Sequence, residues 1–176
     1  GERITRVDSA GTIYVWEAAT GNNLFKKSAG FDDAGYAQHV NCAQCFDDKI
    51  AWVTGDGITV CDFEGKELFN QEFGYVSYAL AASDKSYVAV VADEKLLVFD
   101  IANLKLAAEY EQPSEALKIS RLHQINEDSD SVILSLSQSD EEATSAVCAI
   151  ASIAHGNLKQ IETSENYLIE GHLTKD

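Results

Sequence analysis

The chain has 176 residues, and its 29 aspartate and glutamate residues against 13 lysine and arginine residues give a formal net charge of −16. A charge of this sign and size repels a phosphate backbone, which argues against a nucleic-acid-binding protein. Hydrophobic residues make up 45% of the chain, enough for a folded core, and no apolar run approaches the ~20 residues of a membrane span.

Near the start of the sequence, short runs rich in Val, Ile, Tyr and Phe alternate with turn residues. We predict strands at residues 4–8 and 13–17, separated by a turn at 9–11, and a third strand that begins at residue 23 after a turn at 19–21. Residues 40–46 predict an inner strand of a second unit. They are followed by a hairpin at 49–54 and 58–63 and by a further strand from residue 67. We expect the Asp-Gly pair at 56–57 and the Glu-Gly pair at 64–65 to supply the positive φ that tight hairpin turns require.

A third unit repeats this layout, with predicted strands at 77–82, 87–92, 96–101 and 106–111. Superposed, the three units share columns of similar residues: Ile13, Ile58 and Leu96; Val15, Val60 and Val98; Trp16, Cys61 and Phe99; Glu17, Asp62 and Asp100. Trp16 and Cys61 are 45 residues apart, and Cys61 and Phe99 are 38 apart. Four strands repeating every ~40–45 residues are typical of propeller blades, so the sequence predicts an all-β chain, a β-propeller of four-stranded antiparallel blades.

A fourth unit has predicted strands at 117–123, 131–137, 146–153 and 158–163. The first unit lacks the inner strand that precedes the hairpin in the second and third units, and the strand-like run at 167–170 is not assigned. If that run completes the first unit, four blades close on themselves. We expect instead that residues 1–176 form a partial propeller domain of about four blades within a larger ring.

Two of the four cysteines, Cys42 and Cys45, form a C-x-x-C pattern, which in other contexts binds zinc or carries redox chemistry. Here the pattern lies in a predicted strand, where residues three apart point to opposite faces. We therefore expect packing cysteines and no metal site.

No catalytic constellation is evident in the sequence. The four histidines are scattered, no phosphate-binding loop occurs, and the acidic pairs lack the spacing of a calcium loop. We expect a protein that is not an enzyme, with no catalytic residues and no cofactor.

Two loops are candidate partner-binding sites. Residues 29–39 contain Phe31 and Tyr36, and the acidic loop at 138–144 contains Asp140, Glu141 and Glu142. Loop anchors of this kind bind other protein subunits, and the carboxylates favour a basic protein surface.

The segment from Gly11 to Trp16-Glu17, followed by a Thr-Gly turn at 20–21, resembles the end of a WD-repeat unit. It is equally similar to the repeats of quinoprotein-like propellers. The resemblance extends over nearly the whole chain, but Cys61-Asp62 and Phe99-Asp100 stand where a Trp-Asp pair would be, and the His-Ser-Asp-Trp network of WD repeats cannot be traced. It implies a propeller that serves as a scaffold for protein–protein interactions.

The order of features also resembles the lumenal propeller of a subunit of the endoplasmic reticulum complex that inserts membrane proteins. The matching features are residues 20–25, Gly35, 49–57, 86–90 and the long fourth unit that ends at Gly156. This similarity implies a non-enzymatic subunit that faces the ER lumen. The alternatives are a partial propeller of a quinoprotein-like enzyme, whose site would come from other blades, and a cytosolic or nuclear WD-repeat adaptor.

Overall fold

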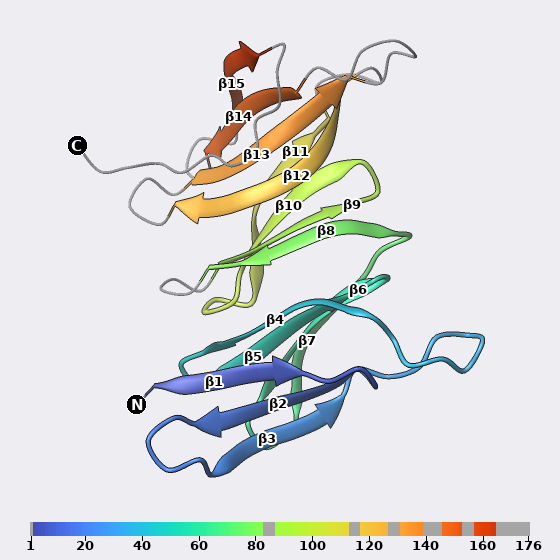
Figure 1. Cartoon of the computed structure of the whole chain (residues 1–176), viewed down its shortest axis with the longest axis vertical. Helices are drawn as coiled ribbons and strands as arrows, with labels where there is room; N and C mark the ends of the chain where they lie inside the picture. The colour runs from blue at the N-terminus through green and yellow to red at the C-terminus, as the bar shows by residue number, and fades with distance from the viewer. Residues whose placement is uncertain are drawn as a thin grey trace.

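The computed structural model describes residues 2–82, 87–112, 117–126, 131–138, 146–152 and 157–164, and every regular element in these ranges is a β-strand. The strands form four antiparallel sheets that are stacked in chain order along the long axis of the molecule (Figure 1). The predicted all-β architecture of antiparallel blades is confirmed. The described part of the chain holds no helix that could cross a membrane.

Each sheet is made of consecutive strands. The first sheet contains β1 (Arg3–Val7), β2 (Thr12–Glu17) and β3 (Asn23–Ser28); the second contains β4 (Val40–Phe46), β5 (Lys49–Thr54), β6 (Gly57–Asp62) and β7 (Glu67–Glu72). The third contains β8 (Val76–Ala81), β9 (Tyr87–Ala92), β10 (Lys95–Asp100) and β11 (Lys105–Glu111); the fourth contains β12 (Leu117–Asn126), β13 (Ser131–Gln138), β14 (Ala146–Ser152) and β15 (Asn157–Ser164). The predicted strand 49–54 coincides with β5, and most other predicted bounds lie within one or two residues.

The recurring acid at the end of the hairpin strand caps the turn that follows it. Asp62 Oδ1 accepts hydrogen bonds from the main-chain N–H groups of Glu64 at 3.0 Å and Lys66 at 2.9 Å. Asp100 Oδ1 accepts one from the N–H of Asn103 at 3.0 Å. Short acidic side chains favour turns because they can hydrogen-bond to main-chain groups two to four residues ahead. Two of the three acids of this column thus cap the turns that follow them, and the third, Glu17, accepts a hydrogen bond from the Thr20 hydroxyl in its own turn.

A separate hydrophobic core fills each interface between neighbouring sheets. Successive side chains of a strand point to opposite faces of the sheet, so each inner sheet contributes to two cores. In β5, Ile50 and Trp52 pack toward the first sheet, while Ala51 and Val53 pack toward the third. The first two sequence columns face the following sheet and are fully buried: Ile13, Val15, Ile58, Val60, Leu96 and Val98. The sheets thus cover one another's faces, as the repeat pattern predicts.

The first sheet has three strands in the described structure, and β1 lies beside β4. In Figure 1, β4, β8 and β12 run in the same direction along one side of the stack, whereas β1 runs the opposite way. Its hairpin partner β2 carries Ile13 and Val15, the counterparts of Ile58 and Val60 in β6. By direction and pairing, β1 corresponds to β5 and β9. The run at 167–170 lies outside the described residues, and membership of a larger ring stays a prediction.

Candidate functional site

The side of the molecule on the right in Figure 1, which we call the rim, is built from two linkers and three hairpin turns. The linkers are residues 29–39, between β3 and β4, and 73–75, between β7 and β8; the turns follow β1, β5 and β9. Because β1, β5 and β9 all end here and β4 and β8 begin here, the topology gathers these segments on one side of the molecule (Figure 1). Loops held on a rigid scaffold are where binding residues concentrate.

The linker 29–39 is a small structured hairpin. Phe31 and Ala37 form an isolated antiparallel bridge, and Asp32 Oδ1 accepts hydrogen bonds from the N–H groups of Ala34 at 3.0 Å and Tyr36 at 2.8 Å. Two of its aromatic side chains nevertheless point to solvent, since Phe31 is 68% exposed and Tyr36 is 72% exposed. The linker therefore presents the two aromatic residues that the sequence identified as candidates.

A hydrogen-bonded network ties this linker to the second sheet. Gln38 Nε2 donates to Asp56 Oδ2 at 2.6 Å, and Thr54 Oγ1 donates to Asp56 Oδ1 at 2.5 Å. Thr54 is only 5% exposed, so its hydroxyl depends on this partner and on the more distant carbonyl of Gly57 at 3.4 Å. The chain thus uses a hydroxyl, a carboxylate and an amide to hold the linker in place.

The linker 73–75 is held in a similar way. Both oxygens of Asp93, in the turn after β9, accept main-chain N–H groups at 3.0 Å, one from Gly74 and one from Tyr75. A Cβ added at Gly74 would lie 2.7 Å from Asp93 Oδ1, so a larger residue there would force the carboxylate to move. Tyr75 itself is 67% exposed. No motif in the sequence pointed to this residue, although the short Phe-Gly-Tyr link between two predicted strands could have revealed it.

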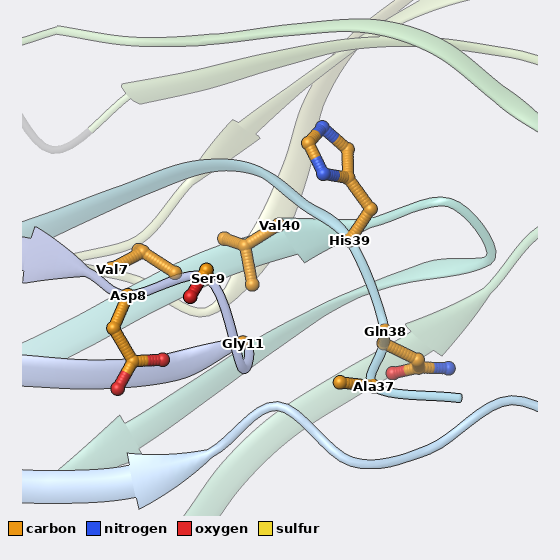
Figure 2. A pocket seen from close by; sticks show the side chains of 8 residues that line it. All are labelled: Val7, Asp8, Ser9, Gly11, Ala37, Gln38, His39 and Val40. Carbon is orange, nitrogen blue, oxygen red and sulfur yellow. The ribbon is translucent and has the colours of Figure 1, made fainter. Parts of the chain in front are cut away.

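The rim also contains two cavities at equivalent places. The larger, of about 360 Å³, lies between the turn after β1 and the end of the linker 29–39 (Figure 2). Its lining is Val7, Asp8, Ser9, Gly11, Ala37, Gln38, His39 and Val40. A second cavity of about 290 Å³ lies between the third and fourth sheets and is lined by Tyr75, Ser77, Val91, Asp93, Glu94, Gln112, Lys118 and Ile119.

The ionisable groups of the larger cavity do not form a catalytic pair. Asp8 accepts main-chain hydrogen bonds from Thr12 and Ala10, each at 2.9 Å, and one from the Tyr14 hydroxyl at 3.1 Å. These bonds, led by that from Thr12, lower the pKa of the Asp8 carboxyl and occupy it as a cap of its own turn. Figure 2 shows the His39 ring turned away from Asp8. The arrangement offers polar binding groups without an acid–base pair.

The cysteines behave as the strand pattern predicts. Cys42 packs against the core between the second and third sheets, whereas Cys45 packs against the core between the first and second. Burial raises the pKa of the Cys42 thiol to about 12, so this group stays protonated at neutral pH. The described residues contain no cluster of His, Cys, Asp and Glu that could hold a metal ion.

Of the predicted site residues, Phe31 and Tyr36 lie together on the rim. Asp140, Glu141 and Glu142 lie outside the described residues, so their role stays a prediction. Asp56, Asp93 and Gln38 hold the two rim linkers in place through hydrogen bonds, and the sequence pattern did not single them out as site residues.

No protein-family model matches the chain, and no curated protein sequence matches it either. Solved structures do match. The C-terminal WD40 domain of Sif2 is similar with a TM-score of 0.53 and 10% identity; the similarity covers 84% of this chain and 40% of that one. The WD40 domain of Neurospora crassa Pan2 is similar with a TM-score of 0.55 and 10% identity, covering 91% of this chain and 46% of that one. The chain thus spans less than half the length of these structures, and the similarity shows that its sheets have the fold of β-propeller blades like those of WD40 domains.

Proposed function

We propose that this chain is a non-enzymatic propeller scaffold that binds other protein subunits through its rim, within a multi-subunit complex. The observation that carries the proposal is the presence of three exposed aromatic side chains, Phe31, Tyr36 and Tyr75, on linkers that carboxylates hold in place. Aromatic residues fixed on a rigid surface are the anchors that dominate protein–protein affinity.

The charge around these anchors favours a basic partner surface. Exposed acids surround the aromatic side chains on the rim: Asp32, Asp33, Asp56, Asp93 and Glu94. Lys118 lies 3.9 Å from Glu94 at the edge of the second cavity. Together with the net charge of −16, this composition steers a cationic partner toward the rim and repels an acidic one.

The length of the chain relative to the two similar structures supports a second part of the proposal, that the chain belongs to a larger propeller. The chain corresponds to 40% and 46% of the two WD40 domains, so we infer that residues 1–176 are one section of a larger propeller. A specific form of the scaffold hypothesis is ER membrane protein complex subunit 1, suggested by the order of sequence features. That identity and the lumenal location stay hypotheses, which mass spectrometry of native complexes would test.

Removing the rim aromatics is the direct test of the proposal. We expect the triple variant Phe31→Ala, Tyr36→Ala and Tyr75→Ala to lose captured partners by at least about tenfold, since each anchor contributes on the order of 1–2 kcal/mol. The measurement is affinity purification from native extract with quantitative mass spectrometry.

The matched control changes two exposed leucines away from the rim, Leu24→Ala and Leu106→Ala, which are 37% and 39% exposed. This control should capture the same partners as the unmodified chain. Equal partner capture by the rim variant and the control would refute the rim as the docking surface.

A second prediction concerns the acidic loop. Charge reversal by Asp140→Lys, Glu141→Lys and Glu142→Lys is expected to weaken binding of a basic partner while leaving the melting temperature unchanged. The sequence predicts a solvated loop here, and charges on such a loop contribute little to stability. Binding of the same partner should be compared at low and high salt. A variant that binds as tightly as the original at low salt would remove this loop from the interface.

A further inference from the structure

The cavity of about 290 Å³ on the rim lies between two sheets in the interior of the chain, the third and the fourth. Val91 of β9 and Ile119 of β12 line it, and both are buried members of the core that these two sheets share. The cavity therefore reaches down to an apolar floor. A site of this kind buries the aliphatic stem of a long side chain as well as holding its polar end.

Polar groups of the lining remain available for a ligand. The pairing of β8 with β9 shifts between Val76 and Tyr78, which makes Ser77 the extra residue of a β-bulge. Bulges redirect side chains and are frequent next to binding sites. Ser77 and Gln112 both line the cavity, and neither side chain makes a hydrogen bond to the residues that the structure describes.

Of the two carboxylates that line the cavity, only one is free to bind a ligand. Both oxygens of Asp93 already accept main-chain N–H groups, from Gly74 and Tyr75. Glu94 has one charged neighbour in the described structure, the ammonium of Lys118 at 3.9 Å, which is beyond hydrogen-bonding distance. Both side chains of this pair are more than half exposed, so their contact is weak and another cation can replace it.

The charge and shape of the lining select the type of side chain that fits. A carboxylate would meet Glu94 in a chain whose net charge is −16. An aliphatic side chain would cover the floor and leave the carboxylate without a partner. A cationic side chain with an apolar stem satisfies both parts of the cavity. The exposed ring of Tyr75 at the mouth favours a planar cation, which stacks on an aromatic face.

We propose that this cavity binds an arginine side chain of the partner protein, an inference that rests on the proposed rim function and specifies the partner's chemistry. The stem of the arginine packs against Val91 and Ile119. Its guanidinium stacks on the Tyr75 ring and donates two parallel hydrogen bonds to the Glu94 carboxylate. It thereby displaces Lys118, whose ammonium is a point charge without a planar fork.

The probe is the tripeptide Ala-Arg-Ala, acetylated and amidated at its ends and titrated into the intact, isotope-labelled chain. Main-chain amide signals of Ser77 and Glu94 should shift and reach saturation. The same peptide with citrulline, which has a neutral group of the same shape, should bind at least about tenfold more weakly. The lysine peptide should bind at least about threefold more weakly than the arginine peptide. Equal binding of the arginine and citrulline peptides would overturn the proposal.

Three variants test whether binding occurs in this cavity. Glu94→Gln should weaken the arginine peptide by at least about tenfold, whereas Lys118→Gln should strengthen it about two- to fivefold by removing the competing cation. The matched control Asp33→Asn removes the same charge from the linker 29–39 and should change the affinity by less than about twofold. All three side chains are exposed, and unchanged amide spectra of the free variants verify the fold. Equal affinities of Glu94→Gln and Asp33→Asn would contradict binding in the cavity.

Partner capture separates this proposal from the rim function on which it rests. Reduced capture by both Glu94→Gln and the triple aromatic variant, together with the peptide preference, is the expected result. If Glu94→Gln captures as much partner as the unmodified chain while the triple aromatic variant captures less, arginine recognition is refuted and the rim function stands. If neither variant captures less, both proposals fail.

Discussion

Replacing Phe99 with alanine is expected to destabilise the fold by about 3–5 kcal/mol, the largest loss among the substitutions considered. Phe99 is 1% exposed, and its ring centroid lies 5.9 Å from that of Phe69 and 6.2 Å from that of Phe73. Alanine would leave a cavity at the core between the second and third sheets. Phe73 is the first residue of the linker 73–75, so removing the Phe99 ring that it packs against should also loosen the rim around Tyr75.

Urea denaturation provides the measurement, with the midpoint falling and the slope unchanged if only stability is affected. The matched control is Phe31→Ala, which removes the same side chain from a 68% exposed position and should change stability by less than about 0.5 kcal/mol. Similar midpoints for Phe99→Ala and the unmodified chain would contradict the packing of these two sheets.

The second large effect is expected from Asp56→Ala, because that carboxylate joins the second sheet to the linker 29–39. Its loss removes the partner of the nearly buried Thr54 hydroxyl and of the Gln38 amide, which should cost about 1–3 kcal/mol. Amide exchange should accelerate at Tyr36 and Gln38, and binding through the rim should weaken.

Two further variants isolate the role of the carboxylate. Asp33→Ala removes an exposed acid of the same linker that makes no side-chain hydrogen bond to the residues described, and it should leave amide exchange unchanged. Asp56→Asn retains one acceptor oxygen and should recover part of the lost protection. If Asp33→Ala loosens the linker as much as Asp56→Ala does, general surface charge and not the network holds it.

The strands were predictable because the pattern that forms them lies within a few consecutive residues of the sequence. Alternation of apolar residues between turn signals placed β5 and β9 at their observed bounds. The repeated columns indicated equivalent positions in successive units. Ile13, Ile58 and Leu96 are each fully buried at an interface between sheets. The opposite orientation of Cys42 and Cys45 also followed from the period of a strand alone.

The rim network was not predictable in the same way, because its partners are distant in sequence. Gln38 and Asp56 are 18 residues apart. Asp93 is likewise 18 residues from Tyr75, whose main-chain N–H donates a hydrogen bond to it. Neither carboxylate differs in local pattern from the other turn acids of the chain. Exposure is likewise a tertiary property: Phe31 and Phe25 are both aromatic residues near a turn, yet Phe25 is buried against Trp52 and Phe63.

The three separate cores have a consequence for how the molecule unfolds. None of the buried side chains described contributes to more than one core. Each sheet is therefore stabilised mainly by packing against its immediate neighbours. Such an array behaves as a one-dimensional chain of coupled units, whose cooperativity depends on the weakest interface. Heat or force should therefore detach the outer sheets first and leave the pair formed by the second and third sheets as the last folded nucleus.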